Sequence, residues 1–217
     1  MLSDSLIYAG IIVPVSILIP ISIGVVKIRY ADKALKIIWY YLVLDGGVNI
    51  LASILADFKI HNLPVLHIFT ILEFLMLSYF YLESLADKIV LRVIRYLMII
   101  FPVFCVMNFL FFQSINHFNT NARAVEALII MACSLAYFAE TNDTDIKWSD
   151  KPYNWINTGI LLYFSGALFI FAFSNVTESY MTKKLHNIYF LMWNIHATLL
   201  LGMYLLFGVG FSKCRKL

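Results

Sequence analysis

The chain has 217 residues, of which 62% are hydrophobic and 13% are charged, and its formal net charge is +3. Soluble domains are typically about 45–50% apolar and about 25% charged, so this composition excludes a soluble monomer. The basic residues form short clusters between apolar runs, which favours anionic membrane lipids over a nucleic acid as partner. Because no long polar block interrupts the chain, we expect residues 1–217 to form one domain.

Seven apolar segments are long enough to cross a bilayer, since a helix needs about 20 apolar residues to span the hydrocarbon core. In chain order these segments are residues 6–26, 37–56, 63–82, 93–112, 124–139, 156–176 and 188–209. The fifth segment is short, and we expect its helix to extend by about a turn at its outer end. The hydrocarbon core offers no partner to free backbone groups, so each span should be helical. The sequence therefore predicts an all-α polytopic membrane protein, a bundle of seven transmembrane helices.

The Lys and Arg residues near the span ends predict the orientation, because cytoplasmic loops are enriched in them. One set of ends carries twelve such residues: Lys27, Arg29, Lys33, Lys36, Lys88, Arg92, Arg95, Lys147, Lys151, Lys213, Arg215 and Lys216. The other set carries four: Lys59, Arg123, Lys183 and Lys184. The larger set should face the cytoplasm, which places the N-terminus outside and the C-terminus inside. Aromatic side chains flank the span ends as interfacial residues do, among them Trp39, Tyr40 and Tyr41.

Ionisable residues inside the spans are the main functional signal, since a carboxylate at the bilayer centre costs about 2.5–3.5 kcal/mol without a partner or water. Asp45 lies near the middle of the second span, with Asn49 one turn further along the same face. These two residues fit either a ligand, ion or proton site or a polar clamp between helices. Glu73 lies close to the middle of the third span, and His67 lies nearer its outer end. Glu126 enters the fifth span near the outer surface, where we expect its carboxylate to reach water.

The seventh span adds Asn194 and His196 to the candidate residues. Asparagines inside membranes usually form hydrogen bonds between helices. At a rise of about 1.5 Å per residue, Asp45, Glu73 and His196 lie at similar depths in their spans. We therefore expect these three residues to share one polar pocket that opens outward and is lined by aromatic side chains. A shallower outer layer should contain His67, Glu126 and Asn187.

Two short motifs resemble those of small, largely uncharacterised seven-helix membrane proteins of bacteria. The third span begins with Asn62-Leu63-Pro64-Val65-Leu66-His67 followed by Glu73-Phe74, and the sixth begins with Trp155-Ile156-Asn157-Thr158-Gly159. The resemblance implies a bacterial inner membrane and, at most, a receptor-like role, and it identifies no ligand.

Three better-known seven-helix classes do not match the sequence. The seventh span has no lysine that would bind retinal, as a microbial rhodopsin requires. The third span ends in Tyr79-Phe80-Tyr81, where a G-protein-coupled receptor has an acidic residue followed by arginine. In the last span, His186 and His196 are ten residues apart, which departs from the His-x-x-x-His pair of ceramidase-like hydrolases.

These features predict a sensory or small-ligand-binding membrane protein, with a small molecule and a cytoplasmic signalling protein as further partners. We expect no catalytic residue, no cofactor and no resident metal. One alternative is a small-solute or proton-coupled transporter, supported by Asp45, by Glu73 and by a weak repeat between His61-Asn62 and His186-Asn187. The other alternative is a metal-dependent membrane hydrolase that would use His67, Glu73 and His196 as zinc ligands.

Overall fold

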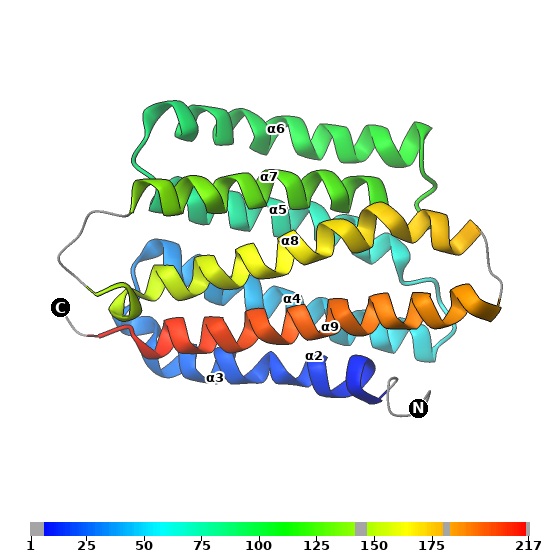
Figure 1. The fold of residues 1–217 in the computed structure, drawn as a ribbon, viewed down its shortest axis with the longest axis horizontal. Coiled ribbons are helices and arrows are strands. Elements are labelled where there is room, and N and C mark those ends of the chain that lie inside the picture. Colours follow the sequence, from blue (N-terminus) through cyan, green and yellow to red (C-terminus); the bar gives the residue numbers. More distant parts are fainter. Residues whose placement is uncertain (1–6, 142–146, 180–182, 216–217) are drawn as a thin grey trace.

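The computed structural model describes the backbone of residues 7–141, 147–179 and 183–215, and the side chains of these residues except 172–179 and 183–189. The regular structure in these ranges is entirely helical, and seven helices are long and apolar enough to cross a membrane. Their axes run roughly parallel along the length of one bundle (Figure 1). The all-α seven-helix prediction is thus confirmed, and the chain is a polytopic membrane protein.

The seven spans match the predicted segments in number and order. The first span, Tyr8–Tyr30, consists of η1 (Tyr8–Ile12), α2 (Val13–Ser16), α3 (Leu18–Lys27) and η2 (Ile28–Tyr30). The other six are α4 (Lys33–Asp57), α5 (Leu63–Ser84), α6 (Lys88–Phe111), α7 (Thr120–Glu140), α8 (Pro152–Ser179) and α9 (Lys183–Ser212), with the short turn η3 (Trp148–Asp150) before α8. The fifth span, α7, begins about one turn before residue 124, as the sequence predicted.

Several helices begin earlier than their apolar segments because polar residues cap them. Asp32 precedes α4, and its carboxylate accepts a hydrogen bond from the backbone N–H of Leu35 at 3.1 Å. Asp87 precedes α6 and accepts from the N–H groups of Ile89 and Val90 at 2.7 and 2.9 Å. Such caps satisfy N–H groups that the first helical turn leaves without partners. Hydropathy alone does not detect these turns.

The first span is irregular because it contains two prolines. It begins as a π-helical turn, continues as α2, breaks at Ile17 and resumes as α3. Pro20 has no N–H group to donate to the carbonyl of Ser16, four residues earlier. Irregular turns next to proline are a common cause of helix kinks.

Helices α8 and α9 pack closely through glycines. A Cβ atom at Gly159 would lie 3.0 Å from the ring of Phe207, and one at Gly166 would overlap the side chain of Leu199. Small residues allow such close helix approach in membranes. By contrast, α6 lies at one edge of the bundle (Figure 1). Its outward side chains include Ile99, which is 67% exposed and would contact lipid.

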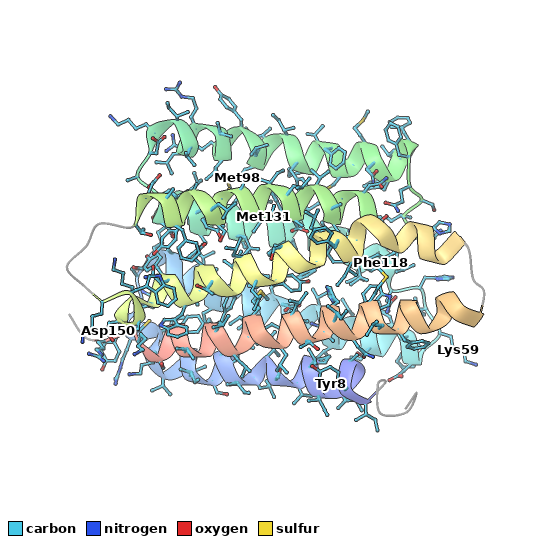
Figure 2. All side chains as sticks on the ribbon, viewed as in Figure 1. Tyr8, Lys59, Met98, Phe118, Met131 and Asp150 are labelled. Atoms are coloured by element: carbon cyan, nitrogen blue, oxygen red, sulfur yellow. The ribbon has the colours of Figure 1, made fainter. Side chains whose placement is uncertain are left out.

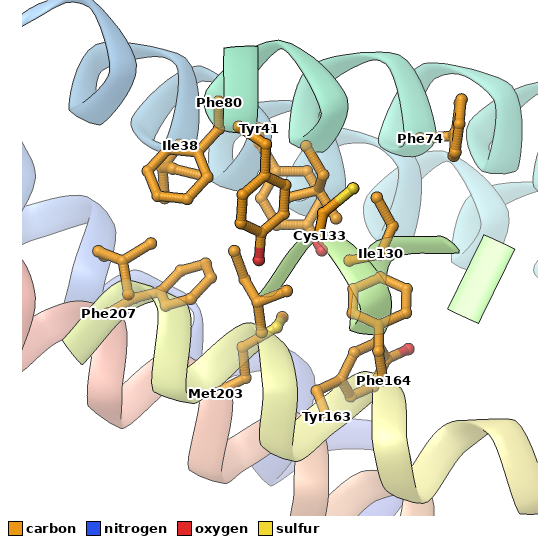
Figure 3. Close-up of a cluster of buried hydrophobic side chains, with 14 of the residues drawn as sticks. Ile38, Tyr41, Phe74, Phe80, Ile130, Cys133, Tyr163, Phe164, Met203 and Phe207 are labelled. Carbon is orange, nitrogen blue, oxygen red and sulfur yellow. The ribbon is translucent and has the colours of Figure 1, made fainter. Parts of the chain in front are cut away.

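The apolar core lies between α4, α5, α7, α8 and α9. Figure 3 shows Tyr41, Ile130, Phe164 and Phe207 converging from four of these helices, and all four are almost fully buried. The packed side chains continue along the bundle toward the end at which α5 and α7 finish. This core fills much of the half of the bundle that the loop charges predict to be cytoplasmic, and buried residues such as Phe69 and Ala122 continue it toward the other end.

A network of neutral polar groups joins α5, α7 and α8 at the same end of the bundle. The hydroxyl of Tyr81 donates to Asn157 Oδ1 at 2.8 Å, and Asn157 Nδ2 donates to the carbonyl of Ser134 at 3.1 Å. The hydroxyl of Tyr137 donates to Asn154 Oδ1 at 3.0 Å. Asn157 therefore connects α5, α7 and α8 through its side-chain amide.

The two ends of the bundle carry different segments. The described chain enters at one end and α9 finishes at the other, as an odd number of spans requires (Figure 1). Figure 2 shows Lys59 and Asp150 at opposite ends of the bundle. Which end faces outward stays a prediction from the loop charges.

Candidate functional site

A cavity of about 220 Å³ lies among α4, α5, α7, α8 and α9, in the predicted outer half of the bundle. Its volume is that of about seven water molecules at roughly 30 Å³ each in the liquid. The lining combines charged, hydroxyl and aromatic side chains: Tyr41, Asp45, Asn49, Leu66, Phe69, Thr70, Glu73, Phe118, Asn119, Arg123, Tyr163, Phe171, Trp193, His196 and Leu200. The cavity is therefore polar on part of its surface and large enough for a small molecule.

An arginine lies between two buried carboxylates beside the cavity. Arg123 Nη1 forms an ion pair with Glu73 Oε2 and donates to Glu126 Oε2 at 3.1 Å. The other oxygen of Glu73 accepts a hydrogen bond from the Tyr41 hydroxyl at 2.8 Å. Because all three charged side chains are almost fully buried, loss of Arg123 would leave two carboxylates without a cation, whereas loss of either glutamate would still leave Arg123 paired with the other.

Arg123 is the main residue that the sequence analysis missed. We counted it among the outer loop residues, but α7 already begins at Thr120 and Arg123 is buried in the span. The spacing between Arg123 and Glu126 is the signal that was available, because residues three apart share one face of a helix. Without Arg123, the outer ends keep three of their four basic residues, so the charge bias behind the predicted orientation becomes larger.

Two further expectations at this site were wrong. Glu126 does not reach water: its side chain is fully buried, and its Oε1 atom has no hydrogen-bond partner among the described residues. The buried Arg123 provides the cation that makes this burial tolerable. Tyr41 is not an interfacial aromatic residue, since it is 1% exposed and its hydroxyl donates to Glu73.

A hydrogen-bonded chain links Arg123 to His196 across the cavity. Arg123 Nη2 donates to the hydroxyl of Tyr163 at 3.1 Å, and this hydroxyl lies 3.1 Å from His196 Nε2. The His196 ring also packs against Tyr163, Phe171 and Trp193, with ring centroids 5.4 to 5.5 Å apart. Glu73 and His196 thus line one cavity, as we expected, but Arg123 and Tyr163 connect them in place of direct contact.

Asp45 lies in the same cavity, with two neutral hydrogen-bond donors. The hydroxyl of Tyr204 donates to Asp45 Oδ2 at 2.6 Å, and Asn49 Nδ2 donates to Asp45 Oδ1 at 2.9 Å. Asp45 is 7% exposed, and within the described parts of the chain no Lys, Arg or His forms a salt bridge with it. Asp45 is therefore a buried carboxyl group without a cationic partner from those residues.

The remaining candidate residues lie outside the cavity lining. His67 is buried, and its Nε2 atom lies 2.9 Å from the carbonyl oxygen of His117. Asn194 is half-buried in α9, and its carbonyl accepts a hydrogen bond from Thr198 at 2.8 Å. The side chains of His186 and Asn187 are outside the described residues.

A zinc site built from His67, Glu73 and His196 has no support in the geometry. Across residues 7–141, 147–171 and 190–215, no three side chains of His, Cys, Asp or Glu come close enough together to hold a metal ion. Glu73 is paired with Arg123, and the described ring nitrogen contacts of both histidines are to protein oxygen atoms.

Comparisons with protein-family models, with curated proteins and with solved structures found no match for this chain.

Proposed function

We propose that the chain is a small-ligand-binding, receptor-like membrane protein, and that the cavity beside Asp45, Glu73 and Arg123 is its ligand site. The observation that carries this proposal is the position of charged side chains around a cavity deep in an apolar bundle. Intramembrane charges are expensive and are usually tolerated where they serve a site or a pathway. A structural clamp between helices needs the paired charges but not the space beside them.

The proposed setting follows from the predicted orientation. We place the protein in the plasma (inner) membrane of a bacterium, with the cavity in the outer half of the bundle. A water-soluble ligand would then arrive from outside. Ligand binding would change the arrangement of the cytoplasmic helix ends, and a signalling protein would recognise that change.

A proton-coupled transporter is the second candidate function. The observation in its favour is the continuous series of polar contacts from Glu73 through Arg123 and Tyr163 to His196, because chains of buried ionisable groups serve as proton relays. Transport also needs a path to the opposite face. In this structure, buried core residues such as Phe164 and Phe207 fill the bundle between the cavity and the predicted cytoplasmic end. We therefore favour a receptor.

The test is a thermal-unfolding screen of the purified protein in detergent, with a library of small amines, alcohols, carboxylic acids and amino acids. A ligand at about 100 times its Kd stabilises the protein by about 2.7 kcal/mol, which for a chain of this size raises Tm by about 5–10 °C. Leu200→Trp fills the cavity and should abolish the shift. Leu205→Trp is the matched control, because Leu205 lies on the same helix but is 46% exposed.

The outcomes separate the two functions. A compound that stabilises the wild type and Leu205→Trp but not Leu200→Trp supports the ligand site. Uptake of the same compound into proteoliposomes along a proton gradient would favour the transporter over the receptor. If no compound in the library gives a shift that depends on Leu200, the proposal fails.

A further inference from the structure

The charges around the cavity do not balance. Three carboxyl groups, those of Asp45, Glu73 and Glu126, lie in or directly behind its wall. Arg123 is the one basic residue, other than His196, among the described residues that line the cavity. The single charge of the guanidinium is shared by both glutamates, so the carboxyl groups outnumber this cation by two, and Asp45 is the carboxyl group that the guanidinium does not contact.

The contacts of Arg123 already engage three of its five N–H donors. Its Nη1 atom serves Glu73 and Glu126, and its Nη2 atom donates to Tyr163. The guanidinium carbon lies 4.8 Å from the centre of the Phe171 ring, so an aromatic side chain covers one face. An anionic ligand would therefore meet carboxylates in the cavity, where the guanidinium among the described lining residues is already paired with two of them.

Asp45, by contrast, retains capacity to accept hydrogen bonds. A carboxylate offers about four acceptor positions over its two oxygens. Tyr204 and Asn49 each donate one hydrogen bond from their side chains, and both donors are neutral. A buried carboxylate is costly until a positive charge pairs with it. A cationic ligand would supply Asp45 with the positive charge that no described residue provides by a salt bridge.

The aromatic lining suits the same chemistry. Phe69, Phe118, Tyr163, Phe171 and Trp193 surround the polar groups of the cavity. Ammonium groups are attracted to the faces of aromatic rings within about 6 Å of the ring centre. Leu66 and Leu200 give the lining an apolar part that would accept a short alkyl group.

We propose that the ligand of this cavity is a small organic amine, whose ammonium group pairs with Asp45 and whose alkyl portion packs among the aromatic side chains. This inference rests on the proposed ligand-binding function and names the class of ligand. The volume of about 220 Å³ restricts the amine to a few carbon atoms. The ligand must carry a positive charge, so carboxylic acids and phosphates should not bind.

The experiment compares three probes of nearly equal size: butylammonium chloride, butanol and sodium butyrate. Each is titrated at millimolar concentrations into the purified protein at constant ionic strength. Binding is followed by Tm and by tryptophan fluorescence, since Trp193 lines the cavity. We expect butylammonium to bind at least tenfold more tightly than butanol and butyrate to give no shift, with Leu200→Trp abolishing the response.

Two variants of α4 test the role of Asp45. Asp45→Asn keeps an oxygen to accept from Tyr204 and removes the charge, so it should bind butylammonium at least tenfold more weakly than the wild type. Asp57→Asn is the matched control, because Asp57 is exposed at the end of the same helix, and its binding should not change. Should Asp45→Asn fail to fold, the comparison of the three probes on the wild type still decides the question.

Each remaining outcome has a defined meaning. If butanol or butyrate binds as tightly as butylammonium, or if Asp45→Asn binds butylammonium like the wild type, the amine proposal is overturned while the ligand site stands. The same holds if neutral or acidic compounds of the library bind in a Leu200-dependent way and amines do not. If no probe or library compound binds, the ligand-binding function itself fails.

Discussion

The ion pair between Glu73 and Arg123 should be strongly coupled energetically. Arg123→Gln leaves two carboxylates without their shared cation, and breaking a buried pair by removing one partner costs about 3–5 kcal/mol. Glu73→Gln should cost less, about 1–3 kcal/mol, because Arg123 keeps its contact with Glu126 and the new amide can still accept from Tyr41. In the double variant, Arg123→Gln leaves only the carboxylate of Glu126 without a cation, because the charge of Glu73 is already gone. The loss of unfolding free energy in the double variant should therefore be smaller than the sum of the losses in the two single variants.

The assay is a double-mutant cycle on the free energy of unfolding in mixed micelles. We expect a coupling energy of about 1.5–3 kcal/mol, in the upper part of the range for residues in contact. The control cycle uses Lys33→Gln and Glu83→Gln, because these residues form an exposed pair at 2.8 Å that water screens. A coupling for Glu73 and Arg123 no larger than that of the control pair would refute the assigned ion pair.

Three other predictions extend to the rest of the bundle. Asp45→Asn should be more stable than Asp45→Leu, since leucine leaves the Tyr204 hydroxyl unpaired at about 1–3 kcal/mol, and equal Tm values would contradict the hydrogen bond. Gly166→Ala should destabilise the protein, because the added Cβ atom on α8 overlaps the side chain of Leu199 on α9. Gly47→Ala has open space around its Cβ and should leave Tm unchanged or raise it. A lower Tm for Gly47→Ala than for Gly166→Ala would contradict the packing. A periplasmic reporter fused at residue 118 should be active and one fused at residue 146 inactive, and the opposite pattern would reverse the orientation.

A weaker coupling should also connect Glu73 and His196. They belong to one hydrogen-bonded chain through Arg123 and Tyr163, so a cycle with Glu73→Gln and His196→Gln should give at least about 0.5 kcal/mol. If the unfolding free energies of the two substitutions add strictly, Glu73 and His196 are not energetically coupled through Arg123 and Tyr163.

The sequence was enough to predict the helices and to single out Asp45 and Glu73 as acidic residues within them. Hydropathy marks apolar segments directly, and Asp45 and Glu73 stand out because nothing around them in the sequence is charged. Their neighbours in space were not predictable, because helix rotation decides which residues meet. Arg123 sits where a span begins, so a count of loop charges assigns it to the loop. Sequence position alone cannot show whether such a residue turns toward water or toward the bundle.

The roles of the tyrosine hydroxyls were the second feature that the sequence did not predict. Tyr41, Tyr163 and Tyr204 provide three of the hydrogen bonds around the cavity, yet in the sequence they resemble interfacial or packing aromatics. A tyrosine carries an apolar ring and a polar tip, so composition and periodicity count it as hydrophobic. The partners of buried carboxylates in such bundles are therefore more visible in a structure than in a sequence.

The neutral network at the start of α8 has a mechanical consequence. Asn157 is fixed there by Tyr81 and by the carbonyl of Ser134, while Tyr163 touches the cavity six residues later, about 9 Å along the axis. If α8 moves as a rigid rod on this fulcrum, an outward shift of about 1 Å at Tyr163 tilts it by about 6°. Pro152, about 7.5 Å to the other side, then swings about 0.8 Å in the opposite direction. The network would thus make α8 pivot at Asn157. A ligand that displaces Tyr163 in the cavity would move the start of α8, at the opposite end of the bundle.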